Sequence, residues 1–206
     1  MGYTQSDEIT LVLCDYQKID TDAWYGYNVQ KMCSIAASIA TFAFSNELRK
    51  IADEVWNYDR QPLALYEEGK RSSAFQEEHT EMIEFLLNKV EKGIFFDARC
   101  FSLPKNEVVN CLIWRQQDAT RNSIQGLAQS LFSHKEIQGI NCKDLQDKIF
   151  RETGINWNSL PDYQKRGACV IKNRSDEWVI DFNIPIFTQD RNYIERRLEF
   201  LEEENG

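Results

Sequence analysis

Apolar positions along this chain follow two different spacings, and these spacings predict a mixture of strands and helices. A polar cluster at residues 4–8 is followed directly by the mostly aliphatic run Ile9–Leu13. This order is typical of a strand with carboxylates at its N-terminal end. Parallel or central strands are apolar on both faces, so polar residues are expected to collect at their ends. Further strands are predicted at residues 95–101, 168–171 and 178–184.

Apolar residues three and four positions apart predict the helices. The first helix is expected over residues 24–46, with Thr21 or Asp22 as its N-cap. A long helix is expected over residues 107–133. Three further segments complete the prediction: a helix at 143–153 between a capping Asn141 and a terminating Gly154, a loop at 161–167, and a charged terminal helix at 192–204.

The segment 47–93 differs from the rest of the chain in being strongly charged, with both signs mixed. Pro62 interrupts it and Gly93 is a natural helix stop, so it is predicted to form two surface helices joined by a loop. We therefore expect a catalytic core built from residues 1–46 and 94–206, with residues 47–93 as an inserted appendage.

Composition places the chain among folded globular proteins. Its 206 residues, 42% of them hydrophobic and 12% aromatic, are enough for one large domain or for one domain with an appendage. No apolar run approaches the length of a membrane span, and no secretory signal is apparent, so a cytoplasmic protein is expected. The net charge of -9 argues against nucleic-acid binding through bulk electrostatics but leaves room for a local basic surface.

Cysteine and histidine usage gives little support to a soft-metal site. The six cysteines are scattered without a CxxC pair, so they are expected to be buried free thiols. His79 and His134 are the only histidines, which excludes a histidine-rich metal site.

Asp7, beside Ser6 and Glu8, is the first candidate for metal chemistry, because a strand end holds a carboxylate rigidly. The alternative is that Ser6 and Asp7 form an ordinary turn, which their residue types favour. Polar stripes along the predicted elements supply the other candidates, and each also fits ordinary packing or a solvated surface. They are Lys31, Ser34, Ser38 and Thr41 on the first helix, Asp97 and Arg99 on one strand face, Arg115, Asp118 and Asn122 on the long helix, and Lys165 and Arg166 in the loop.

Five segments occur together in an order that resembles one known family. They are GYTQSDEITLVL, KMCSIAAS, FFDARCF, WRQQDATRNS and GINWNSLPDYQKRGACV. The order and approximate places resemble those of the tRNA-His guanylyltransferase family of reverse, 3′-to-5′ polymerases. The resemblance covers most of the chain except the charged stretch 47–92. The residues Thr120–Ser123, where eukaryotic members have a His-Ile-Asn-Asn run, make the chain more similar to the guanylyltransferase-like branch that repairs truncated tRNA 5′ ends.

This resemblance implies an α+β fold, with a palm-like antiparallel sheet of the polymerase and cyclase type, packed helices and the inserted charged segment. It also implies a nucleotidyltransferase that adds nucleotides to the 5′ end of tRNA, with GTP and ATP as substrates and two Mg²⁺ ions at the reacting oxygens. The implied partners are tRNA, nucleoside triphosphates and further copies of the chain, in a dimer or tetramer.

The resemblance also assigns candidate roles. Asp7 corresponds to one of two metal-binding aspartates, with Ser6 and Glu8 in the same catalytic motif. The remaining matched residues are Lys31, Ser34 and Arg99 near the triphosphate, Asp118 and Asn122 on the family's helix, and Lys165 and Arg166 in its basic loop, with the last four assigned to tRNA binding. The net acidity of the chain separately implies that tRNA would bind on a restricted basic surface. That surface would include Arg115, Arg121, Lys165, Arg166, Lys172 and Arg174.

One departure leaves a second function class open. The family has an earlier strand, carrying the other metal-binding aspartate, ahead of the Ser-Asp-Glu motif, and this sequence begins at that motif. The chain is therefore expected either to be completed by such a segment or to be a non-catalytic tRNA-binding or split-enzyme subunit. A different palm-type enzyme, such as a cyclase, is a third possibility.

Overall fold

The computed structural model describes residues 1–16, 20–59 and 84–199. The contacts divide the chain into two compact units. Unit 1 comprises residues 1–22 and 102–206, and unit 2 comprises residues 23–101. Pro62, His79 and the predicted loop between the two charged helices lie outside the described residues.

Unit 1 is built on a four-stranded antiparallel sheet with the order β2-β1-β3-β4. The strands are β1 (Gly2–Gln5), β2 (Glu8–Leu11), β3 (Ala168–Lys172) and β4 (Trp178–Asp181). β1 and β2 form a hairpin. On its other side β1 pairs with β3, and Tyr3 lies opposite Cys169 in this pairing. The polar segment 4–8 is therefore one strand end, a turn and the start of the next strand. The expected Ile9–Leu13 strand lies at the sheet edge, not at its centre.

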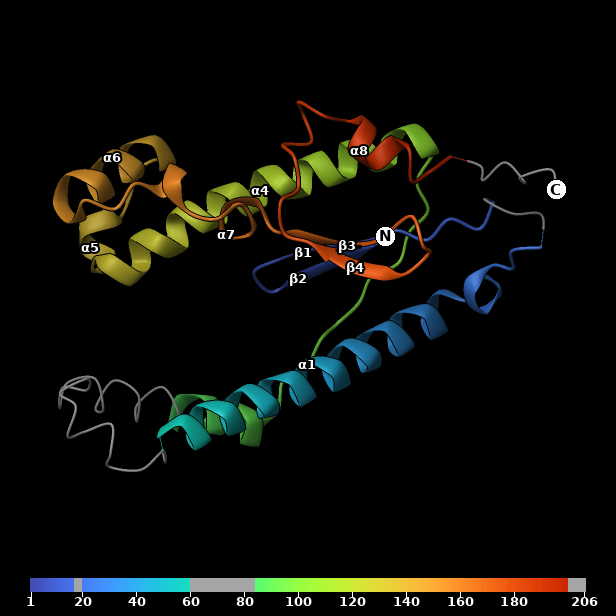
Figure 1. Ribbon diagram of the computed structural model, residues 1–206, viewed down its shortest axis with the longest axis horizontal. Helices are drawn as coiled ribbons and strands as arrows, with labels where there is room; N and C mark the ends of the chain where they lie inside the picture. The colour runs from blue at the N-terminus through green and yellow to red at the C-terminus, as the bar shows by residue number, and fades with distance from the viewer. Residues whose placement is uncertain (17–19, 60–83, 200–206) are drawn as a thin grey trace. The chain divides into compact units, whose positions relative to one another are not determined.

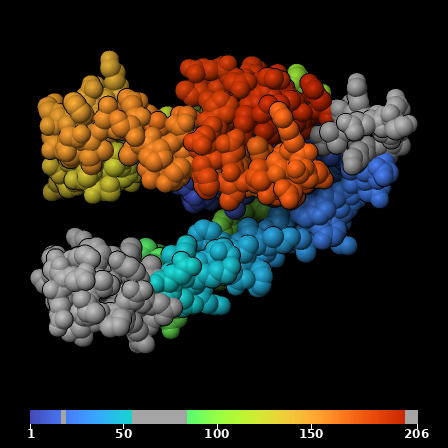
Figure 2. Space-filling view, in the orientation of Figure 1, coloured from blue at the N-terminus to red at the C-terminus, as the bar shows by residue number. Residues whose placement is uncertain are grey.

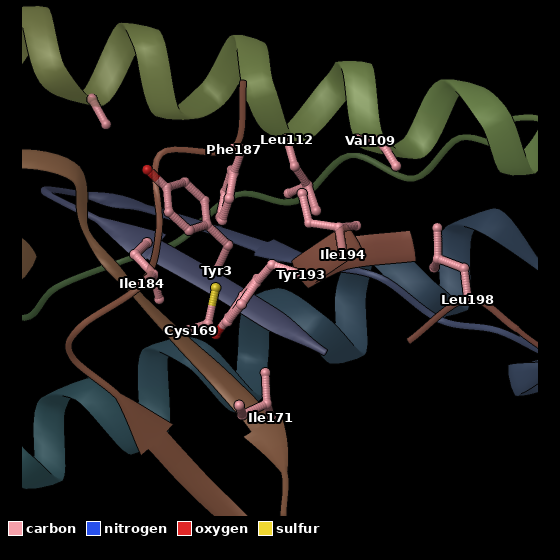
Figure 3. Packing of buried hydrophobic residues seen from close by; sticks show 11 residues of the cluster. Tyr3, Val109, Leu112, Cys169, Ile171, Ile184, Phe187, Tyr193, Ile194 and Leu198 are labelled. Atoms are coloured by element: carbon pink, nitrogen blue, oxygen red, sulfur yellow. The ribbon is translucent and has the colours of Figure 1, made fainter. Parts of the chain in front are cut away.

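The long helix α4 (Lys105–Leu131) covers one face of the sheet, and α8 (Asn192–Glu195) lies on the same side (Figure 1). Leu112 of α4, Tyr3 of β1, Phe187 and Ile194 pack together in the main core (Figure 3). The rings of Tyr3 and Phe187 meet edge to face with their centroids 5.8 Å apart. Burial of these side chains fixes α4 over the strands that carry the Ser6–Asp7 turn.

A second core lies around the C-terminal half of α4. Ile124 and Ala128 pack against Leu145 and Ile149, together with partly buried neighbours. The elements added here are α5 (His134–Ile137), α6 (Cys142–Thr153), η2 (Trp157–Ser159) and α7 (Asp162–Arg166). In Figure 2 the part around α5 and α6 is yellow and orange, beside the mostly red C-terminal part over the sheet.

Unit 2 consists of η1 (Trp24–Tyr27), the 31-residue helix α1 (Val29–Asp59), a helical stretch at 84–92 and an extended segment at 93–101. Asn28 caps α1, since its side chain accepts a hydrogen bond of 3.0 Å from the Lys31 backbone N–H. The extended segment is anchored to α1 by Thr41, whose hydroxyl accepts from the Phe96 N–H at 3.0 Å, and by the Phe44 ring, 5.6 Å from that of Phe96.

Most helix and strand predictions are confirmed, including the Asn141 cap, which accepts from the Asp144 N–H, and the left-handed Gly154 at the end of α6. The predicted α+β fold with an antiparallel sheet and packed helices is also confirmed. No helix within the described ranges combines the length and the hydropathy that a bilayer crossing needs.

Two predicted elements in unit 2 are wrong. Residues 95–101 form no strand: they alternate between exposed and half-buried positions, and the half-buried Phe96 and Cys100 pack on α1. Side chains of an extended segment point alternately to its two sides, so burial has a two-residue period whenever one side is covered. The covering element can be a strand or a helix. The first helix is capped by Asn28 and not by Thr21 or Asp22, because Tyr25, Gly26 and Tyr27, all within η1, have positive φ, so the regular helix begins only at Val29.

Three further details differ from prediction. Residues 162–166, predicted as loop, form α7 directly after Pro161, a residue suited to helix starts. The terminal helix is only Asn192–Glu195, and residues 200–204 lie outside the described residues. All six cysteines are free thiols, as predicted. Only Cys169 is fully buried, and the other five are partly exposed.

The boundary expected near residue 46 does not coincide with a helix end, because α1 continues to Asp59. That residues 47–93 form an insertion in a core made of residues 1–46 and 94–206 stays a prediction.

Candidate functional site

The Ser6–Asp7 turn joins β1 to β2 in a two-residue hairpin loop. Gln5 and Glu8 are paired on either side of it. Ser6 has φ of 57°, whereas Asp7 is not among the positive-φ residues, which is the sign pattern of a type II′ turn. The Ser6 hydroxyl donates a hydrogen bond of 3.1 Å to the Asp7 carboxylate and so restrains it.

The polar line predicted on the long helix faces this hairpin. Arg115, Asp118 and Asn122 follow one another at helical spacing along α4, so they share one side of the helix. Together with the hairpin they line a small surface depression, which we name the hairpin hollow. Its lining residues are Tyr3, Gln5, Asp7, Glu8, Thr10, Arg115, Asp118, Ala119 and Asn122.

An ion pair crosses the hairpin hollow. One guanidinium nitrogen of Arg115 donates to both carboxylate oxygens of Glu8, at 3.0 and 2.8 Å. The carboxylate of Asp118 is likewise engaged, by Arg121 at 2.6 Å and by the Asn122 amide at 3.4 Å. Asp7 has no cation partner among the residues that the structure describes.

These contacts decide which groups are available for an incoming ligand. The charges of Glu8 and Asp118 are balanced by arginines, whereas the Asp7 carboxylate is held only by a hydroxyl and is exposed. Within the described ranges, no three His, Cys, Asp or Glu side chains are arranged to hold a metal ion. The hairpin hollow therefore offers one oriented carboxylate but not a complete ligand set for two magnesium ions.

Tyr3 lines the hairpin hollow and links β1 to α7 through a hydrogen bond. Its hydroxyl donates a hydrogen bond of 2.7 Å to the Arg166 carbonyl, and burial raises the pKa of this phenol well above its usual range. Gly167, at φ +85°, follows directly; a Cβ at this position would lie 2.4 Å from the Thr4 carbonyl oxygen. Only glycine permits this close approach of the chain to β1.

The basic pair Lys165 and Arg166 is engaged in local contacts on α7. Both side chains pair with Asp162, at 3.2 and 2.5 Å respectively. Lys165 also donates to the Asn158 carbonyl and Arg166 to the Ile184 carbonyl, each at 2.9 Å. These charges stabilise the packing of α7 onto the sheet, and the tRNA-binding role remains a prediction.

The residues predicted near a triphosphate all lie in unit 2. Cys100, which follows Arg99, donates to the sulfur of Met32, which follows Lys31, with the two sulfurs 3.8 Å apart. Arg99 and Lys31 therefore lie at the same level of α1, and both are exposed. The hydroxyl of Ser34 donates to the Lys31 carbonyl at 3.2 Å, so part of the predicted polar stripe serves the helix itself.

Two kinds of residue at or near the site were not predicted from the sequence. Tyr3, Gln5 and Thr10 line the hairpin hollow only because the chain returns on itself as a hairpin, and the sequence was interpreted there as one strand. Gln116 is buried on α4. Its side-chain amide donates a hydrogen bond of 2.9 Å to the Pro185 carbonyl and accepts one of 2.8 Å from the Phe187 N–H. Its position between Leu112 and Ala119 on the apolar face was the available signal.

Comparisons with known proteins support the resemblance. The tRNAHis guanylyltransferase family profile matches residues 1–104. An uncharacterized protein of Acanthamoeba polyphaga mimivirus is 28% identical over 97% of this chain and 66% of its own length. The tRNA(His) guanylyltransferase of Saccharomyces cerevisiae is 29% identical over 38% of each chain, and tRNA(His) guanylyltransferase 1 of Arabidopsis thaliana is 33% identical over 41% of this chain and 17% of its own. This chain thus spans no more than about two thirds of the length of these relatives.

Solved structures extend the similarity to nearly the whole chain. A bacterial tRNA(His) guanylyltransferase-like protein in complex with ATP superposes with a TM-score of 0.72 and 39% identity, over 97% of this chain and 71% of the other. A bacterial protein of the same description in complex with GTP gives a TM-score of 0.62 and 32% identity, over 97% and 69%. On these matches in sequence and in structure, the chain belongs to the tRNAHis guanylyltransferase family.

Proposed function

We propose that this chain carries part of the active site of a nucleotidyltransferase that adds nucleotides to the 5′ end of tRNA in the 3′-to-5′ direction, either to repair a truncated end or to guanylylate it. The observation that carries this proposal is the meeting of the Ser6-Asp7-Glu8 turn with the polar line of α4 in one hollow. Relatives of the same family have been solved with ATP and with GTP, which supports nucleoside triphosphates as substrates.

In the proposed reaction a nucleoside triphosphate such as ATP first transfers its nucleotidyl group to the 5′-monophosphate of the RNA, and pyrophosphate leaves. The 3′-hydroxyl of an incoming GTP then attacks the activated 5′ phosphorus, and the activating nucleotide leaves as its monophosphate. The polar groups required for this chemistry are donors to phosphate oxygens and fixed carboxylates. The exposed cations Lys31 and Arg99, with the Ser34 hydroxyl, are proposed for the triphosphate.

Asp7 is the proposed catalytic carboxylate, since it is oriented by Ser6 and exposed to an incoming ligand. Glu8 is proposed to position Arg115, whose fork would otherwise be free to rotate. Mg²⁺ is the expected metal because phosphoryl and nucleotidyl transfer favours hard cations bound by oxygen. The described residues do not complete a site for two such ions, so further oxygen ligands are required.

The proposed tRNA surface extends from the hairpin hollow along α4 to α7. It includes Arg115, Asp118, Asn122, Lys165 and Arg166. In this surface Arg121 is paired with Asp118, and Lys172 is paired with Asp176 at 2.7 Å. Exposed ion pairs of this kind are weak and can exchange for phosphate contacts. Assembly into a dimer or tetramer is proposed because one acidic chain offers only a restricted basic area.

A second candidate is a non-catalytic tRNA-binding or split-enzyme subunit. The specific observation in its favour is that Glu8 and Asp118 are already neutralised by arginines, which leaves Asp7 as the one uncompensated carboxylate among the described lining residues.

One experiment separates these candidates. The protein is incubated with a 5′-monophosphorylated, 5′-truncated tRNA, ATP, Mg²⁺ and radiolabelled GTP, and incorporation is compared between the wild type, Asp7→Asn and Asp147→Asn. Asp147 is a matched exposed aspartate on α6, away from the hairpin hollow. We expect Asp7→Asn to reduce incorporation by roughly 100-fold or more and Asp147→Asn to have no effect.

Unchanged incorporation by Asp7→Asn would overturn the assignment of Asp7. Tight binding of the tRNA without any incorporation, even when an N-terminal segment that supplies the further oxygen ligands is added, would support the non-catalytic candidate. An absence of both binding and incorporation under the same conditions would reject both candidates.

A further inference from the structure

Trp114 is an exposed indole at the outer rim of the hairpin hollow. It lies on α4 four residues before Asp118, so the two side chains are neighbours on the helix surface, and 58% of its surface is exposed. An indole contributes a large apolar area that is usually buried. This tryptophan contributes nothing to either of the two cores of unit 1.

The surroundings of this indole are polar and fixed. The guanidinium of Arg115 lies over the ring, 5.5 Å from its centroid, and the same guanidinium is held by Glu8. Arg121, seven residues along α4, is held by Asp118. Trp114 is thus an apolar π-surface surrounded by charged groups that are already paired with one another.

The size of the hairpin hollow limits what can enter it. Its water-accessible volume is about 10 Å³, which is room for about one water molecule. A purine or pyrimidine ring cannot fit inside and must lie at the rim if its phosphate or ribose is to reach Asp7. At the α4 rim, the aromatic surface available for such a ring is that of Trp114.

We propose that the Trp114 indole is a stacking platform for a nucleobase whose sugar-phosphate end is presented to the hairpin hollow. A nucleobase fits this position because its π-face matches the indole and its polar edges match the surrounding charged groups. The inference rests on the proposed function and deepens it. The base belongs either to the nucleoside triphosphate or to the end of the RNA, and these two sources are separated by the ligand used in the test.

The test compares three variants with the wild type in equilibrium binding. Trp114→Leu removes the π-surface, and Trp114→Tyr retains an aromatic ring. The matched control is Phe85→Leu, because Phe85 is not among the residues of the proposed tRNA surface, is 60% exposed and also has a cation over its ring, Lys89 at 5.2 Å. The ligands are GTP, ATP, the 5′-truncated tRNA, and inorganic tripolyphosphate as a probe without a base.

We expect Trp114→Leu to raise the Kd of one base-bearing ligand by roughly 5- to 150-fold, the range expected for the loss of one base–aromatic stack. Trp114→Tyr should restore most of this affinity, whereas Phe85→Leu should bind as the wild type does. Tripolyphosphate should bind equally to all four proteins. A loss confined to GTP or ATP identifies the triphosphate as the source of the base, and a loss confined to tRNA identifies the RNA.

An unchanged Kd of Trp114→Leu for GTP, ATP and tRNA would overturn the inference while leaving the proposed function intact. An equal loss in Trp114→Leu and Trp114→Tyr would also overturn stacking. If the wild type binds these ligands but incorporates nothing, the catalytic proposal fails and the stacking proposal is still decided by the Kd values. A wild type that binds none of them would refute both. Thermal unfolding of each variant checks that the helix is intact.

Discussion

Arg115 and Glu8 are 107 positions apart in the chain, and the Arg115 guanidinium donates to both carboxylate oxygens of Glu8 at 3.0 and 2.8 Å. This pair joins α4 to the start of β2 beside Asp7. About a third of the Arg115 side chain and over half of the Glu8 side chain are exposed, so solvent screens the attraction. The pair is therefore better suited to fixing geometry than to stabilising the fold.

A double-mutant cycle of Arg115→Met and Glu8→Gln should give a coupling energy of about 0.5–1 kcal/mol in urea unfolding, and less at high salt. Lys172 and Asp176 form a matched pair in the same unit, with a single contact of 2.7 Å. The corresponding cycle there should give no more than about 0.5 kcal/mol. A coupling at Arg115 and Glu8 no larger than in this control would contradict the expected contribution of the two-oxygen contact.

Replacement of Gln116 by leucine should lower the free energy of unfolding by about 2–4 kcal/mol. The buried amide satisfies both the Pro185 carbonyl and the Phe187 N–H, and leucine would leave both without these partners. The exposed neighbour Gln117 is the control, and Gln117→Leu should change stability by less than about 0.5 kcal/mol. Equal effects of the two variants in chemical denaturation would show that these hydrogen bonds do not matter.

Two glycine-to-alanine variants should have opposite effects. Gly167→Ala should destabilise the protein by roughly 2–4 kcal/mol, because its φ is +85° and the new Cβ would lie 2.4 Å from the Thr4 carbonyl oxygen. Gly126→Ala, in the interior of α4 with nothing within 4 Å, should raise stability by about 0.5–1 kcal/mol. Thermal melts of both variants measure the difference, and a stable Gly167→Ala would refute the close approach to β1.

Stability should fall in alkaline solution partly through Cys169. Burial raises the pKa of this thiol from 9.0 to about 11, so the folded state retains the proton that the unfolded state loses. The resulting stabilisation is complete below about pH 9 and is lost as the pH rises through 11.

The stability difference between the wild type and Cys169→Ala should therefore shrink by about 2 kcal/mol between pH 7.5 and pH 10.5. Tyr3 and Tyr193, whose pKa values are raised mainly by burial, are present in both proteins, so the part of their contribution that comes from burial cancels. A constant difference across this pH range, measured by urea unfolding, would mean that Cys169 does not titrate as its burial implies.

The sequence by itself predicted most of the elements and the main polar groups of the site. The period of 3.6 residues placed α4, and the residue types of Asn141 and Gly154 marked the two ends of α6. The line of Arg115, Asp118 and Asn122 was visible because helical spacing puts such residues on one side whatever the helix packs against. Local chemistry of this kind needs no knowledge of distant contacts.

The tertiary structure decided which of these groups meet. The pairing of β1 with β3 joins residues more than 160 positions apart, and it brings Gly167 and Arg166 against the strand that leads to Asp7. Whether residues 95–101 would pair as a strand or pack on a helix depended on a partner in α1, because a period of two is common to both. The neutralisation of Glu8 by Arg115 likewise required two segments 107 positions apart to come together. Such contacts depend on the packing of the whole unit, and no local pattern in the sequence contains them.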